Sequence, residues 1–97
     1  MSDLNLLKDV SRDNFFQVSN GTIIRSMLEL DEALENMSNE TFQYHVNNYK
    51  NDLANWIKDT IKDDVLANKL NGIIDKTKTE LIVLRRIIEI LKSNCVA

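Results

Sequence analysis

The sequence is poor in the residues that interrupt helices. It has no proline, and among its 97 residues there are only two glycines, Gly21 and Gly72. Proline and glycine are the residues that oppose helix propagation most strongly. Hydrophobic residues make up 43% of the chain and charged residues 28%, a balance that is ordinary for a globular protein in water. We therefore expect a mainly helical fold, built as a single domain over residues 1–97 because a chain of this length supplies one core.

The sequence also has only one cysteine and a small net charge. The one cysteine, Cys95, cannot form an intramolecular disulfide, so we expect a reducing compartment, most simply the cytoplasm. The net charge of −3 is too weak to favour nucleic acid or an anionic membrane as a partner. The first ten residues carry Asp3 and Asp9 and lack the apolar run of a signal peptide. Every apolar run is far shorter than the roughly 20 residues of a membrane span, so we expect no membrane segment.

Two short segments precede the predicted helices. Residues 1–14 form an N-terminal arm with apolar residues at three-residue spacing, which is typical of a short amphipathic helix or a docking arm. Residues 15–25 place two aromatic or β-branched runs around Asn20-Gly21, a pair that adopts positive φ readily and predicts a β-hairpin. Two strands are marginal on their own, so we expect the hairpin to pack Phe15 or Phe16 on a helical layer.

Residues 26–97 are predicted to form a compact, irregular bundle of four to five helices. Each predicted helix follows a side chain that can accept a hydrogen bond from the first helical turn. The predicted caps are Ser26 (with Glu29 in a capping box), Ser38, Asn51 or Asp52, and Asp63 or Asp64. The corresponding helices cover about 27–36, 39 to 47 or 48, 52–61, and 64 onward. The apolar positions predicted to face inward are Met27, Leu30, Leu34, Met37, Phe42, Val46, Tyr49, Leu53, Trp56, Ile57, Ile61, Leu66, Ala67, Leu70, Ile73 and Ile74.

The C-terminal third allows two interpretations. Apolar residues recur at alternating spacings of three and four along residues 67–95, which is the heptad pattern of a dimeric coiled coil. An unbroken helix over 64–93 would extend about 45 Å, beyond the roughly 32 Å diameter of a globule of this size. Gly72 weakens such a helix, and Thr77 with Glu80 forms a second capping box that would restart it. We favour a break near Thr77.

The last predicted helix carries more apolar surface than one contact face needs. One stripe comprises Leu81, Leu84, Ile88 and Leu91, and the other comprises Val83, Ile87 and Ile90. Such a helix either forms the centre of the core or faces a second subunit. We expect self-association, as a homodimer, or docking of a protein partner. The residues predicted to form this contact are Leu81, Leu84, Ile87, Ile88 and Leu91.

Motifs for catalysis are missing from the sequence. It contains no glycine-rich phosphate loop, no cysteine pair, no serine in a glycine elbow and no second histidine. We therefore expect no catalytic residue, no metal site and no cofactor. His45, the one imidazole, lies seven residues before Asp52, which could orient it as a base in a small-ligand or hydrolytic site. The structural alternative, which we favour, is a joint in which His45 ties the second predicted helix to the start of the third.

Three further groups of polar or aromatic residues have simple structural interpretations. Trp56 shares a predicted helix face with Leu53 and is expected in the core. Arg85-Arg86 lies among acidic residues and is expected on a solvated face rather than along a phosphate backbone. The acidic residues at 59, 63 and 64 match no calcium-loop spacing and are explained by helix capping.

Several runs along the chain resemble a family of small helical domains of unknown function found in archaeal and some bacterial proteins. The resemblance covers roughly residues 15–70. The matching residues are Phe42-Gln43-Tyr44-His45-Val46, Lys50-Asn51-Asp52-Leu53, Trp56-Ile57, Asp64 and Leu66-Ala67, with a lead-in of Phe16, Asn20-Gly21, Ile24, Ser26, Leu30, Leu34 and Met37. Family members often have phenylalanine in place of Leu53 and glycine in place of Lys62. The resemblance implies a mostly helical fold and marks His45, Asn51, Asp52 and Trp56 as signature positions, whether structural or for binding.

Overall fold

The computed structural model describes residues 3–94. Within these residues the chain forms five α-helices and one two-stranded antiparallel hairpin, which confirms the predicted fold class. The α-helices are α1 (Met27–Asn36), α2 (Asn39–His45), α3 (Asp52–Trp56), α4 (Asp64–Leu70) and α5 (Lys76–Ser93). The strands are β1 (Phe16–Gln17) and β2 (Ile23–Ile24), and the shorter helical turns are η1 (Asp3–Leu7), η2 (Arg12–Asn14) and η3 (Ile57–Ile61).

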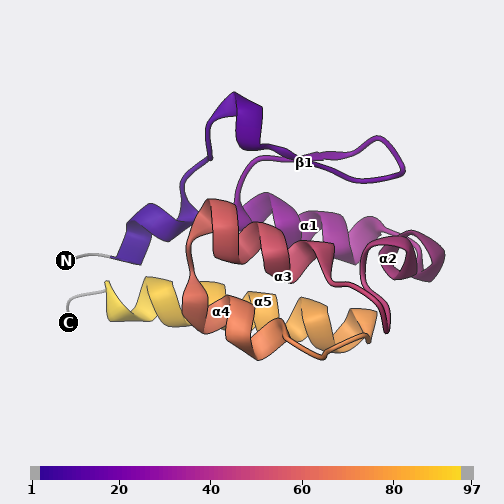
Figure 1. The fold of residues 1–97 in the computed structure, drawn as a ribbon. Helices are drawn as coiled ribbons and strands as arrows, with labels where there is room; N and C mark the ends of the chain where they lie inside the picture. Colours follow the sequence, from indigo (N-terminus) through magenta and orange to yellow (C-terminus); the bar gives the residue numbers. More distant parts are fainter. Residues whose placement is uncertain (1–2, 95–97) are drawn as a thin grey trace.

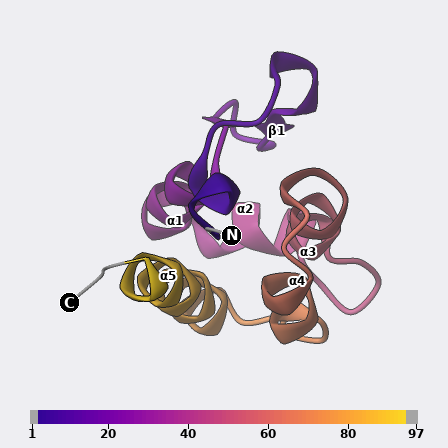
Figure 2. The same ribbon diagram turned by 90° about the vertical axis from the view of Figure 1, so that its left-hand side faces the viewer.

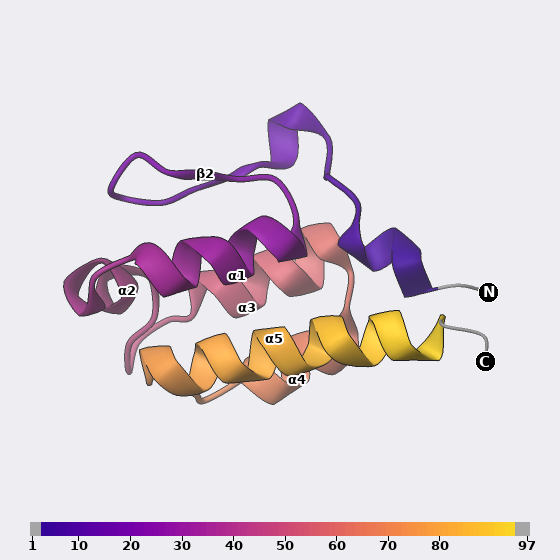
Figure 3. The same ribbon diagram turned by 180° about the vertical axis from the view of Figure 1, so that it is seen from behind.

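Four helices follow the long axis of the molecule, and α2 lies across one end of them (Figure 1). Seen end-on, α1, α5, α4 and α3 occupy the corners of a square that encloses the core, with the hairpin outside it (Figure 2). Helices α1 and α5 lie side by side and run in opposite directions (Figure 3). Helix α5 packs against α1, α4 and η1, so the segment predicted as an N-terminal arm rests against the last helix.

The helices begin where the sequence predicts. Side-chain oxygens of Ser26, Ser38, Asn51 and Asp63 each accept a hydrogen bond from a backbone N–H in the first turn of the helix that follows. The capping box at α1 differs in one detail, because the Glu29 carboxylate accepts from the N–H of Arg25, one residue before the cap. These local hydrogen bonds satisfy amides that have no partner within the helix.

Most of the residues predicted to lie in the core are buried. The wrongly predicted ones follow the ends of helices. Helix α2 ends at His45, two or three residues earlier than expected, and Val46 and Asn51 form an antiparallel bridge that closes a tight turn between them. Tyr49 lies in this turn and is 96% exposed, so its predicted inward position is wrong. Ile74 is also exposed, because α4 ends at Leu70 and the next helix has not yet begun.

The break between the last two helices is confirmed, with a different cap. Helix α4 ends at Leu70, Gly72 adopts a φ of 82°, and α5 begins at Lys76. The N-cap is Asp75, whose carboxylate accepts from the N–H of Lys78 at 2.7 Å. The predicted restart at Thr77 is therefore two residues late, since an aspartate at the cap position provides the stronger, charged acceptor.

Only one of the two apolar stripes of α5 belongs to the core. Val83, Ile87 and Ile90 are buried, whereas the side chains of the other stripe are exposed. Ile87 is therefore wrongly placed among the predicted self-association residues. Cys95 lies outside the described residues. Among residues 3–94, no helix is both long and apolar enough to cross a membrane.

An ion pair of Asp63 and Arg86 lies in the interior between α4 and α5. The guanidinium donates from Nε to Oδ2 at 2.7 Å and from Nη2 to Oδ1 at 3.1 Å, while Nη1 donates to Glu89. The hydrogen bonds to Asp63 raise the pKa of Arg86 further, although burial acts in the opposite direction. The predicted solvated position of Arg86 is wrong, because the Asp63 carboxylate that caps α4 draws the guanidinium inward.

The turn that ends η3 is strained at one residue. The N–H groups of Lys62 and Asp63 both donate to the carbonyl oxygen of Ile57, which closes a wide π-helical turn. This geometry places Lys62 in the left-handed region, at φ 67° and ψ 36°. A side chain in this region costs about 1–2 kcal/mol, and glycine avoids that cost.

Replacing Lys62 with glycine is expected to raise the free energy of unfolding by about 0.5–1 kcal/mol, after subtraction of the extra freedom of glycine in the unfolded chain. Lys58→Gly is the matched control, because Lys58 lies in the same turn with its side chain exposed. There the loss of helix propensity is expected to lower stability by about 1 kcal/mol. Urea denaturation measures both variants, and destabilisation by Lys62→Gly would contradict the explanation.

Candidate functional site

His45 lies at the point where the hairpin, α2 and α3 meet. It is the last residue of α2 and is buried. Its Nε2 accepts a hydrogen bond from the backbone N–H of Ser19 at 2.9 Å, and its Nδ1 lies 3.0 Å from Oδ2 of Asp52. Because Nε2 accepts, the neutral ring carries its proton on Nδ1 and donates it to Asp52. The predicted contact between His45 and the start of the third helix is therefore confirmed.

Asp52 is the polar centre of this cluster. Its Oδ2 accepts from Lys50 Nζ at 2.9 Å as well as from His45. Partial burial alone would raise the pKa of Asp52, but the hydrogen bonds from Lys50 and His45 outweigh it, and the pKa is lowered. The carboxylate is thus held in its charged form, which suits an acceptor of two hydrogen bonds.

Asn51 and Trp56 connect the same region to two other parts of the fold. The Asn51 side chain caps α3 by accepting from Ala54 N–H at 2.9 Å, and its Nδ2 donates to the carbonyl of Leu70 at 3.2 Å. Trp56 is buried as predicted, and its Nε1 donates to the carbonyl of Asn14 at 2.8 Å. Both side chains therefore satisfy backbone groups of other segments.

Phe16 of the hairpin packs between the two aromatic members of the cluster. Its ring centroid lies 5.1 Å from that of His45 and 5.8 Å from that of Trp56, both with edge-to-face geometry. The expectation that Phe15 or Phe16 would lie on the helices is thus met by Phe16. Ser19 was not predicted, since its backbone N–H gives no signal in the sequence.

Contacts among His45, Asp52, Phe16 and Trp56 join the hairpin and α2 to α3, and Asn51 separately joins the start of α3 to α4. An open surface hollow lies against this cluster, and its lining includes His45 itself together with Ser19, Lys50 and Asp52. A general base needs a free lone pair within reach of its substrate. The Nε2 lone pair of His45 is directed at the Ser19 N–H instead, so proton abstraction there requires the hairpin to release the ring.

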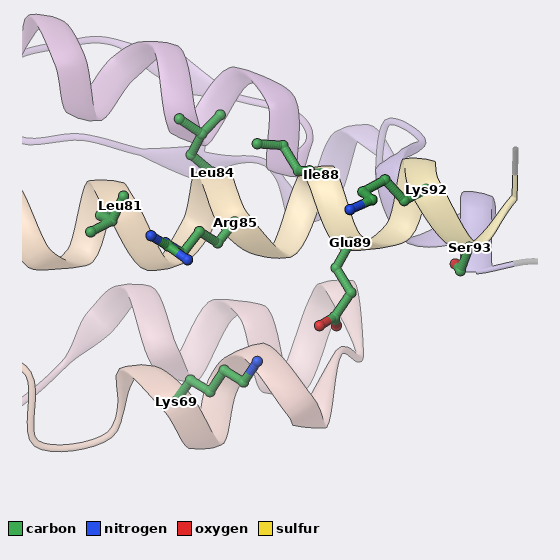
Figure 4. A pocket seen from close by; sticks show the side chains of 8 residues that line it. All are labelled: Lys69, Leu81, Leu84, Arg85, Ile88, Glu89, Lys92 and Ser93. Carbon is green, nitrogen blue, oxygen red and sulfur yellow. The ribbon is translucent and has the colours of Figure 1, made fainter.

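A second candidate site is the outer face of α5. Four apolar side chains lie in a row along it, and each is between 40% and 48% exposed; they are Leu81, Leu84, Ile88 and Leu91. We call these four residues the apolar row. Figure 4 shows Leu84 and Ile88 pointing to the side of α1, while Glu89 points to the opposite side, towards α4, which carries Lys69. A shallow groove of about 810 Å³ runs along this face; it is lined by three residues of the row and by charged side chains, namely Leu81, Leu84, Ile88, Lys69, Arg85, Glu89 and Lys92.

Among the described residues, no group of three or more histidine, cysteine or acidic side chains is arranged to hold a metal ion. The acidic residue at 63 caps α4 and pairs with an arginine, in agreement with the predicted capping role.

The fold and these two sites define a small helical protein with an N-terminal hairpin. A family model described as a family of unknown function (DUF5752) matches residues 46–97, and the chain belongs to this family. The match shares residues 46–70 with the resemblance seen in the sequence and extends it through α5. No curated protein and no solved structure gives a significant match to the chain.

Proposed function

We propose that this protein is a non-enzymatic interaction module that binds protein through the outer face of α5. The observation that carries the proposal is the apolar row, because four large side chains in line on one helix are half exposed while the same helix also supplies the core. Contiguous exposed apolar surface rimmed by charged residues is typical of protein-binding sites.

The His45 cluster has a structural part in this proposal. It holds the hairpin against α2 and α3 through bonds that occupy both nitrogens of the ring. The packing of the helices then leaves α5 with one face inward and one face outward. The row lies on the longest helix of the described chain and is therefore presented by a rigid element.

Photo-cross-linking in the cells that make the protein tests this function. With p-benzoylphenylalanine at position 84 we expect a covalent adduct with protein, and the adduct should disappear when Ile88→Lys is added. The matched control carries the same probe at Val65, an exposed residue of α4 outside the groove. Equal adducts from both positions, or none from position 84, would overturn the proposed docking surface.

A further inference from the structure

The two sides of the apolar row differ in charge. Successive residues of an α-helix are rotated by about 100°, which places Glu80 on one side of the row. Three basic residues follow on the other side at heptad spacing, and Lys69 of α4 extends them. We call this set the basic edge; it comprises Lys69, Lys78, Arg85 and Lys92. Glu89 lines the same groove, but its carboxylate is paired with Arg86, so the edge keeps an excess of positive charge.

Carboxylates gather on the opposite side, where α1 adjoins α5. Burial raises the pKa of Asp31 on α1, and the nearby charges of Glu80 and Glu35 raise it further. Asp31 and Glu35 lie one turn apart on α1, and α1 packs against α5, which carries Glu80. We call these three residues the acidic edge. The Lys76 ammonium lies 3.7 Å from Glu80 and balances one of the three carboxylates. The acidic edge therefore keeps an excess of negative charge.

We propose that the apolar row binds a second copy of this chain, with the two α5 helices side by side and parallel. This inference rests on the proposed function and names the partner of the same surface. The apolar row can form the same contact whether the two α5 helices run parallel or antiparallel. The charged edges therefore decide which of these two orientations is favoured.

The choice follows from two-fold symmetry. A two-fold axis parallel to α5 brings the acidic edge of each copy against the basic edge of the other, whereas an axis perpendicular to the helices brings like charges together. In heptad terms, Glu80 then faces the partner's Arg85 twice in the dimer, which is the usual flanking pair of a parallel coiled coil. An antiparallel pair would set Arg85 near the partner's Arg85. Complementary charge thus makes the surface self-complementary in the parallel arrangement alone.

The existence of the dimer is tested by sedimentation equilibrium of the purified chain from micromolar to millimolar concentration. We expect a concentration-dependent dimer, and Leu84→Lys should weaken it about tenfold or more by placing a charge in the middle of the row. Val65→Lys is the matched control and should leave the dissociation constant unchanged. Circular dichroism checks that both variants keep the wild-type helix content, since both replaced side chains are exposed.

The orientation is tested by disulfide cross-linking in a Cys95→Ser background. In a parallel dimer each position of the row faces itself, so Leu81→Cys and Leu91→Cys should each cross-link alone. In an antiparallel dimer, position 81 of one chain faces position 91 of the other. The two copies of position 81 are then ten residues apart, or about 15 Å along the helix axis, and the same holds for position 91. That separation exceeds the roughly 7 Å limit between the α-carbons of a disulfide.

The outcomes separate this inference from the proposed function. Cross-linking that appears only when the Leu81→Cys and Leu91→Cys chains are mixed would overturn the parallel arrangement. A strict monomer at every concentration would overturn the dimer. In both cases an adduct from position 84 with a different protein would leave the docking surface itself in place.

Discussion

Replacing Arg86 with methionine is expected to lower the free energy of unfolding by about 3 kcal/mol, the lower end of the cost of breaking a buried ion pair. Methionine keeps the apolar stem of the side chain but removes both bonds to the Asp63 carboxylate. That carboxylate would remain in the interior with one backbone partner, the N–H of Leu66. An uncompensated buried charge is costly because little solvent reaches it.

The neighbouring arginine provides a matched control. Arg85 is exposed one residue earlier on the same helix, and Arg85→Met is expected to change stability by less than about 0.5 kcal/mol. The double variant Asp63→Asn with Arg86→Met should recover part of the loss, since a neutral amide can still cap α4. Thermal and urea unfolding measure all three variants. Equal, small effects of the two arginine substitutions would contradict an interior ion pair.

Replacing His45 with alanine is expected to destabilise the protein by about 2–4 kcal/mol, from an unpaired amide and a lost aromatic contact. The Ser19 N–H would lose its acceptor, Asp52 would lose one donor, and Phe16 would lose one of its two edge-to-face partners. Urea denaturation measures the change. Gln43→Ala is the control, because Gln43 is exposed on the same helix and alanine is a good helix former.

The same variant distinguishes a joint from a ligand site. A joint requires that His45→Ala lower the melting temperature while the dimer dissociation constant, measured on folded protein, stays that of the wild type. A catalytic or ligand-binding histidine would give the reverse result, with preserved stability and lost activity or affinity. A melting temperature unchanged by His45→Ala would therefore contradict the structural role proposed for the cluster.

Helix starts and the hairpin could be read from neighbouring residues, because the chemistry that fixes them is local. A serine, asparagine or aspartate before an apolar periodic segment satisfies the first amides of a helix wherever the helix lies. Asn20-Gly21 likewise allows the turn of the hairpin before any packing is specified, and Gly21 adopts a φ of 94°.

Helix ends were harder to predict than helix starts. The expected end of α2 was late because the bridge between Val46 and Asn51 closes the turn only when α3 and α4 are in place, with Asn51 bound to the Leu70 carbonyl. The left-handed conformation of Lys62 has the same origin, since two N–H groups converge on one carbonyl to redirect the chain into α4.

The partners of the candidate residues depended on contacts between segments far apart in the chain. The sequence indicated that His45 would meet the start of α3, but not that Ser19, 26 residues earlier, would occupy its other nitrogen. Arg85 and Arg86 are neighbours of the same type, yet one is exposed and the other is buried against Asp63. The heptad pattern gave α5 two apolar stripes and no means of choosing between them. The choice was made by packing. Helix α5 packs against α1, α4 and η1, which leaves Val83, Ile87 and Ile90 buried, and within residues 3–94 the apolar row remains half exposed.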